Sequence, residues 1–252
     1  MSQASGQDNR RERLVVIGGS GLVGSLIVPT LCEDYDVRVL DPFAPKYEAD
    51  VEWVEGSSTD YAALTKAFNG VDMFVYLAMG PKDPAVWEEP ELAALQFDMA
   101  VKGTYLTMRA AEANGVRHGV HASSMSVFED YPNEAGPIGN IRPDCTHFYG
   151  LAKRLGEEVI AAGVKRTGIS VMALRLSLPM ADDDWTAATD PIVVTVGTAG
   201  SDVASAFQAG LLRRGHGFEA VAISGDRHER YSDLGPAKEL LGWEPLVIHP
   251  LS

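Results

Sequence analysis

The sequence has few cysteines, few basic residues and no long hydrophobic run. Its two cysteines, Cys32 and Cys145, lie far apart in unlike contexts, so they offer no metal-ligand cluster and indicate a reducing cytoplasm. Lysine and arginine number 21 against 35 acidic residues. The net charge of -14, with no basic patch, argues against nucleic acid as a partner. No segment is long and apolar enough to span a bilayer, so we expect no membrane partner.

The composition is otherwise that of a globular protein. Hydrophobic residues make up 46% of the 252 residues, which is enough for a sizeable core. A basic run followed by an apolar stretch imitates an export signal near the start of the chain, but the apolar stretch is glycine-rich and shows no small-residue cleavage site. We therefore predict a polar, disordered tail over residues 1–13 and a single domain over residues 14–252.

A glycine-rich stretch near the start of the chain is the main motif. The aliphatic run 14–17 predicts a strand, the segment 25–31 predicts a helix, and the glycines between them have the spacing GxxGxxG. Such a turn holds a dinucleotide pyrophosphate at the positive end of a helix. The pattern alone is weak, because similar turns occur where nothing binds. The cofactor-binding residues predicted here are Gly18, Gly21, Leu22, Val23 and Gly24.

Strands and helices alternate along the rest of the chain. We predict strands at residues 36–40, 51–54, 71–77, 117–122, 169–174 and 218–223. We predict helices from a cap at residues 56–60 to residue 68, and at residues 91–114, 148–163, 202–212 and 236–241, with loops at residues 81–90, 132–145 and 182–184. This alternation indicates an α/β fold, a doubly wound parallel sheet with helices on both faces.

Asp41 ends the second predicted strand. It follows the glycine turn by about 20 residues, where an acidic side chain accepts hydrogen bonds from the adenosine ribose hydroxyls. Because a carboxylate repels a 2′-phosphate, this position favours NAD over NADP.

Ser124, Tyr149 and Lys153 form the candidate catalytic set. Ser124 follows the fifth predicted strand, and one helical turn places Tyr149 and Lys153 on the same face. A free phenol has a pKa of about 10, so the ammonium is expected to favour its ionised form. Tyr149 would then remove a hydroxyl proton while hydride leaves the carbinol carbon for a nicotinamide. Ser124 would bond the same oxygen, and Lys153 would also hold the nicotinamide ribose.

The motifs together resemble a known family. The glycine turn, Ser123-Ser124-Met-Ser-Val127 and Tyr149-Gly-Leu-Ala-Lys153 are similar to the extended short-chain dehydrogenases, the NAD-dependent epimerase/dehydratase group, over about residues 13–246. This resemblance implies a Rossmann-type fold, bound NAD, a homodimer through the two long helices, and the catalytic roles given above. The further cofactor contacts that we expect from it are Ser57, Ser58, Leu77, Ala78 and Met79.

Two positions depart from the family pattern. Ala100 stands where the group usually has Asn before Val-x-Gly-Thr, and Ser57 replaces the usual Asp, which would weaken the grip on adenine. If the family's Asn helps a proton relay, turnover here is slow or uses another route.

The chain after Arg175 is short, so we expect a small substrate lobe from about residues 176–200 and 224–252. A small sugar or polyol therefore fits better than a nucleotide sugar. In length and in its closing Leu-Gly-Trp-Glu-Pro the chain resembles uronate dehydrogenases, but Met125-Ser126 replaces their Asn-His pair, and an acidic run stands where an Arg would clamp a carboxylate. The candidate substrate contacts are Met125, Ser126 and His147.

Three functions stay open from the sequence. The first is an NAD-dependent oxidoreductase acting on a secondary alcohol of a small sugar-like molecule. The second is an epimerase or dehydratase that retains NAD and returns the hydride. The third is a dinucleotide-binding sensor in which Ala100 and Ser57 record lost catalysis. We expect NAD and a small-molecule substrate, no metal, and a cytoplasmic location.

Overall fold

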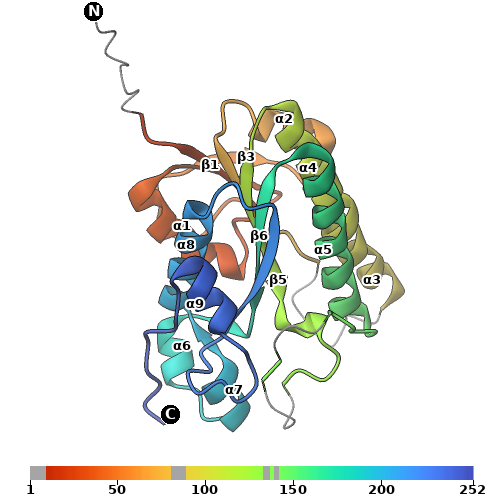
Figure 1. Ribbon diagram of the computed structural model, residues 1–252. Helices are drawn as coiled ribbons and strands as arrows, with labels where there is room; N and C mark the ends of the chain where they lie inside the picture. The colour runs from red at the N-terminus through yellow and green to blue at the C-terminus, as the bar shows by residue number, and fades with distance from the viewer. Residues whose placement is uncertain (1–9, 81–88, 133–136, 139–141, 252) are drawn as a thin grey trace, which may run out of the picture.

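The computed structural model describes residues 10–80, 89–132, 137–138 and 142–251 (Figure 1). Within these residues, seven parallel strands form one sheet in the order β3-β2-β1-β4-β5-β6-β9. The order reverses between β1 and β4, which confirms the predicted doubly wound sheet. The strands are β1 (Arg13–Ile17), β2 (Asp36–Asp41), β3 (Glu52–Glu55), β4 (Met73–Tyr76), β5 (His118–Ser124), β6 (Ser170–Leu176) and β9 (Phe218–Ile223).

Helices cover both faces of the sheet, as Figure 1 shows. One layer consists of α1 (Leu22–Asp34), α8 (Gly200–Leu212) and α9 (Gly235–Leu241), and the other of α2 (Tyr61–Ala67), α4 (Thr104–Ala113) and α5 (Phe148–Thr167). The Asp60 carboxylate caps α2 by accepting the N–H groups of Ala62 and Ala63. In the part of the chain that the structure describes, every helix is too short or too polar to cross a lipid bilayer.

Two hydrophobic clusters hold these layers together. Leu14 and Val16 of β1 pack in one cluster with residues of α1, α8 and α9, whereas Val15 and Ile17 pack in the other with residues of α2, α4 and α5. Successive strand residues point to opposite faces, so a sheet covered on both faces needs apolar residues at every position. This is why β1 and β4 appear in the sequence as nearly continuous apolar runs.

The helix predicted over residues 91–114 contains a π-helical turn. It consists of α3 (Pro90–Phe97), the π-helix η2 (Asp98–Gly103) and α4. The carbonyl oxygen of Ala100 in η2 packs against Gly156 of α5, where a Cβ atom would come within 2.8 Å of it. The residue at the position of the family's Asn therefore lies in an irregular turn that contacts α5, the helix that carries Tyr149 and Lys153.

The segment after β6 has more structure than the sequence predicts. It forms α6 (Asp182–Thr186) and α7 (Pro191–Val196), and β7 (Pro179–Met180) pairs with β8 (Thr198–Ala199). The predicted surface loop at residues 182–184 is wrong, because these residues begin α6. Asp182 Oδ1 accepts the Ser201 N–H at 2.9 Å, and the Trp185 side chain is buried. Helices this short do not reveal an amphipathic period.

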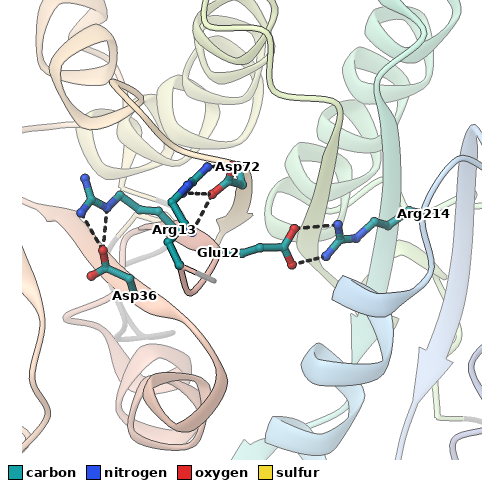
Figure 2. A network of polar contacts seen from close by, with 6 residues as sticks. Glu12, Arg13, Asp36, Asp72 and Arg214 are labelled. Atoms are coloured by element: carbon teal, nitrogen blue, oxygen red, sulfur yellow. Dashed lines mark hydrogen bonds and ion pairs between the residues drawn. The ribbon is translucent and has the colours of Figure 1, made fainter. Parts of the chain in front are cut away.

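Ion pairs fasten the N-terminal segment to the end of the sheet where the strands begin (Figure 2). The Glu12 carboxylate accepts two hydrogen bonds from the Arg214 guanidinium, at 2.8 and 2.7 Å. Arg13 donates through its guanidinium to Asp36 at 2.6 Å and through its backbone N–H to Asp72 at 2.8 Å. The segment is thus joined to β2, to the loop after α8 and to the residue before β4.

The disordered tail predicted over residues 1–13 is therefore wrong for residues 10–13. Arg10 also pairs with Asp72, through two contacts of 2.8 Å. The tail was predicted from its polar composition, which does not reveal that Arg10, Glu12 and Arg13 pair with charged residues elsewhere in the chain. Residues 1–9, and most of the loop predicted at residues 81–90, lie outside the described residues.

Candidate active site

The glycine turn between β1 and α1 leaves no room for side chains. Gly18 has a φ of 81°, a Cβ atom on it would lie 2.6 Å from Cα of Ala78, and a Cβ atom on Gly24 would overlap the carbonyl oxygen of Gly19. The Gly18 N–H donates to the Leu40 carbonyl at 2.8 Å. The turn therefore lies against the ends of β2 and β4, where the strand order reverses and where α/β sheets bind ligands.

The first turn of α1 is suited to an anion. Its N-cap residue, Gly21, has no side chain that could cap the helix, and Leu22, Val23 and Gly24 follow without an acidic residue. The first N–H groups of a helix have no partner within it and lie at the positive end of its dipole. The structure thus places the predicted phosphate-binding residues together.

Asp41 lies beside this turn with both carboxylate oxygens fixed. Oδ2 accepts the Ser20 N–H at 3.1 Å, Oδ1 accepts the Phe43 N–H at 3.0 Å, and the Trp53 indole donates to the Asp41 carbonyl at 3.0 Å. The side chain is thus held at the rim of the glycine turn, as predicted for a residue that contacts ribose.

The other predicted cofactor contacts differ in their position and in how deeply their side chains are buried. Leu77, Ala78 and Met79 follow β4, and the close approach of Ala78 to Gly18 brings them to the glycine turn. Ser57 lies near the surface, with its hydroxyl 2.9 Å from that of Thr59. The Ser58 side chain is buried at 4% exposure, and its hydroxyl contacts Tyr76 and Met99 in the interior. Its contact with a cofactor stays a prediction.

Ser124, Tyr149 and Lys153 meet at the carboxyl end of β5. The Tyr149 hydroxyl is hydrogen-bonded to that of Ser124, whose Oγ also accepts the Ser126 N–H at 3.1 Å. The Lys153 ammonium donates to the Ala122 carbonyl at 3.0 Å. β5 is two strands from β1 in the sheet, so this end and the glycine turn share one edge.

The prediction that the Lys153 ammonium favours the ionised form of Tyr149 is not supported by the charges around the phenol. Burial raises the pKa of Tyr149, and the hydrogen bond with Ser124 opposes that rise. Burial lowers the pKa of Lys153 to about 8, although the Glu157 carboxylate acts to raise it. The group that favours the ionised phenol is therefore Ser124, and the ammonium is directed to a backbone carbonyl instead.

The predicted substrate contacts differ in their exposure. Met125 begins the short 3-10 helix η3 (Met125–Val127) and its side chain packs in the hydrophobic core at 1% exposure, so its contact with substrate stays a prediction. Ser126 is half-buried, and His147 is exposed just before α5. A thioether at the start of a tight turn is drawn into the core by the apolar surface it buries. Within the described residues, no three His, Cys, Asp or Glu side chains are placed to bind a metal.

A buried network of charged residues lies beside Lys153 and was not predicted from the sequence. The Glu157 carboxylate accepts the Ser123 hydroxyl at 2.6 Å and pairs with the Arg175 guanidinium at 2.8 Å. Glu157 lies four residues after Lys153, so helical spacing alone places it on the same face of α5. That spacing is the signal that could have revealed it.

Comparison with known proteins identifies the family. The model of the NAD dependent epimerase/dehydratase family matches residues 14–188, which include the glycine turn, Asp41 and the catalytic set. The chain belongs to this family. It is therefore an enzyme of the extended short-chain dehydrogenase type, in a family whose cofactor is NAD. The described residues fit that cofactor, because the glycine turn excludes side chains, the first turn of α1 is uncapped and Asp41 lies at the rim.

Several family members resemble the chain. A 4-epimerase of N-acetyl-alpha-D-glucosaminyl-diphospho-ditrans,octacis-undecaprenol from Escherichia coli O157:H7 is 30% identical over 149 residues, which are 59% of this chain but only 43% of the epimerase. An L-arabinose 1-dehydrogenase (NAD(P)(+)) from Haloferax volcanii is 28% identical over 186 residues, 68% of this chain and 69% of that protein. The uronate dehydrogenase of Agrobacterium tumefaciens superimposes with a TM-score of 0.79 at 19% identity, over 95% of this chain and 86% of the other.

Proposed function

We propose that the protein is an NAD-dependent oxidoreductase that moves a hydride between NAD and a secondary alcohol of a small, sugar-like substrate. The observation that carries this proposal is the hydrogen-bonded pair of hydroxyls, Ser124 and Tyr149, on the same sheet edge as the glycine turn. A partly buried phenol paired with a serine can hold one substrate oxygen from two sides.

The proposed step is the oxidation of an alcohol. Bound NAD supplies the hydride acceptor. Tyr149, as phenolate, accepts the hydroxyl proton, while the carbon–hydrogen bond gives up its electron pair as hydride and the C–O bond becomes a carbonyl. Ser124 donates to the substrate oxygen throughout. Lys153 holds the nicotinamide ribose from the adjacent turn of α5.

The short substrate lobe, residues 176–200 and 224–252, supports a small substrate without a carboxylate. The Tyr131 hydroxyl bonds those of Ser177 at 2.9 Å and Ser232 at 3.0 Å, so the loop after Ser124 is tied to both parts of this lobe. Residues 176–200 contain four Asp and no Lys or Arg. A bidentate Arg is the usual receptor of a carboxylate, so the first part of this lobe, residues 176–200, suits an aldose or polyol better than a uronate.

A second candidate is an epimerase that retains NAD and returns the hydride to the substrate. The similarity to the Escherichia coli 4-epimerase favours it, but that alignment leaves out more than half of the epimerase. The two candidates differ in whether NADH accumulates.

The experiment incubates the purified protein and NAD with a panel of aldoses, polyols and uronates and follows NADH formation. We expect NADH with a neutral sugar or polyol. NAD that stays bound while a sugar changes configuration would favour the epimerase, and saturable NAD binding without turnover of any alcohol would refute both in favour of a sensor.

The catalytic role of Tyr149 has its own test. Tyr149→Phe should lower turnover by at least about 100-fold, because proton transfer by a positioned base contributes on that order. NAD affinity should stay nearly unchanged. Tyr105→Phe on the exposed face of α4 is the matched control. Equal activity in Tyr149→Phe would remove this residue from the mechanism.

We further propose a homodimer that packs through α4 and α5. Tyr105 on α4 is 52% exposed and Leu155 on α5 is 36% exposed, so this layer presents apolar surface.

We also propose a cytoplasmic location. Free thiols at Cys32 and Cys145 are consistent with it.

A further inference from the structure

A buried carboxylate lies one helical turn beyond Lys153. Glu157 of α5 is 5% exposed, and its Oε1 accepts hydrogen bonds from the Ser123 hydroxyl at 2.6 Å and from Arg175 Nε at 2.9 Å. Its Oε2 accepts Arg175 Nη2 at 2.8 Å, and the guanidinium lies over the Phe128 ring, 5.1 Å from its centre. One side chain thus joins α5, β5 and β6, the elements that carry or adjoin the catalytic set.

Glu157 offsets part of the positive charge in this region. Lys153 on α5 and Arg175 on β6 are two cations in the interior. Burial raises the pKa of Tyr149 and lowers that of His121 well below its usual range, so these two neighbours of Lys153 are neutral. His121 also has no hydrogen-bond partner for either ring nitrogen, and its ring stacks on Tyr76. The Glu157 carboxylate is therefore the negative charge that acts on Lys153.

A purely structural role would explain only part of this arrangement. A buried bidentate pair between Glu157 and Arg175 would join α5 to β6 whatever lay next to it. However, Lys153 donates to a neutral carbonyl, that of Ala122, and a buried ammonium with only that contact loses most of the stabilisation that water would give it. The same carboxylate that pairs with Arg175 is placed to supply the missing counter-charge.

We propose that Glu157 is a positioning residue whose carboxylate keeps Lys153 in its ammonium form, and that Arg175 limits how much of this negative charge reaches Lys153. The inference rests on the proposed role of Lys153 in holding the nicotinamide ribose. It concerns the protein's own charges, so it applies before any cofactor or substrate binds.

The direction of the effect follows from electrostatics. The pKa of Lys153 is about 8 even though Glu157 acts to raise it, because burial lowers it by more. Removing the carboxylate charge should lower this pKa further, by about one pH unit or more, as expected when a nearby opposite charge is lost. Near neutral pH about half or more of the lysine would then be uncharged.

The test is a pH titration of the apo protein that contains lysine labelled with carbon-13 at Cε, followed by NMR. The Lys153 signal is assigned by its loss in Lys153→Arg. Glu157→Gln should move the midpoint of this signal down by about one pH unit or more. Glu158→Gln should leave it in place, because Glu158 is an exposed neighbour on the same helix, paired with Arg142 at 3.2 Å.

A second variant keeps the inference testable if Glu157→Gln does not fold. Arg175→Gln removes the cation that competes for Glu157, so the Lys153 midpoint should move up instead of down. Glu157→Asp keeps the charge and should restore most of the wild-type midpoint. A Lys153 midpoint that does not move in either Glu157→Gln or Arg175→Gln, or that moves equally in Glu158→Gln, overturns the inference.

This readout is separate from catalysis. If the midpoints move as expected and no alcohol is oxidised, the counter-charge role stands and the proposed oxidoreductase function fails. If NADH forms but the midpoints do not move, the function stands and Glu157 is only a structural link. Where turnover is found, the alkaline limit of kcat/KM should fall to lower pH in Glu157→Gln and not in Glu158→Gln.

Discussion

Asp41→Asn is the most direct test of how the protein selects its coenzyme. The substitution keeps the size of the side chain and removes its charge. The wild-type carboxylate accepts one backbone N–H on each oxygen, from Ser20 and from Phe43. An amide has one acceptor oxygen, so it can satisfy only one of these two donors.

The expected loss of NAD affinity follows from the hydrogen bond that the substitution removes. A hydrogen bond to a charged group contributes about 1.5–3 kcal/mol, so the loss of one such bond to the ribose should weaken NAD binding by about 10- to 150-fold. The carboxylate also repels the 2′-phosphate of NADP, and this repulsion disappears in the variant. The ratio of the two dissociation constants should therefore shift toward NADP by at least about tenfold.

The assay is a calorimetric titration of each dinucleotide into wild type and variant. Asp36→Asn is the matched control, because Asp36 begins the strand that Asp41 ends and pairs only with groups at the opposite end of the sheet. Either an unchanged preference in Asp41→Asn or an equal shift in Asp36→Asn would refute the ribose role of Asp41.

Three further predictions test other parts of the structure. Gly24→Ala should abolish measurable NAD binding and destabilise the fold by about 3 kcal/mol or more in denaturant titrations, because the new methyl group overlaps the Gly19 carbonyl. Lys153→Met should raise the free energy of unfolding by about 2–3 kcal/mol at pH 7. Lys153 titrates near 8 in the folded state and near 10.5 when unfolded, so wild-type stability rises with pH across this interval and the advantage of the variant should vanish above it. Leu155→Glu should convert the proposed dimer to a monomer in light scattering after gel filtration, whereas Leu212→Glu, an exposed leucine at the end of α8, should not.

The sheet was predictable because its central strands are buried on both faces. β1, β4 and β6 are mostly apolar and long enough to stand out, and the helices between them require a parallel arrangement. The two short helices after β6 were not predictable, since α6 depends on Trp185 packing in the interior and on Asp182 contacting the start of α8. Such contacts join distant parts of the chain and leave no local period.

The site was predictable where the chemistry demands a fixed spacing. The glycine turn, Asp41 and the pair Tyr149 and Lys153 follow from local geometry, and the structure places them on one edge of the sheet. The direction in which a side chain points was harder to predict from the sequence. Met125 follows Ser124 directly, yet it turns into the core, because a 3-10 helix begins there and its side chain points away from the edge.

The ion pairs of Figure 2 have a practical consequence for handling the protein. They hold Glu12 and Arg13 where the strands start, whereas Ser124 lies where β5 ends, so the described N-terminal segment is at the opposite end of the sheet from the candidate active site. An affinity handle or a surface tether is best attached at that end. The opposite terminus is less suitable, because His249 contacts the Trp185 carbonyl in the substrate lobe.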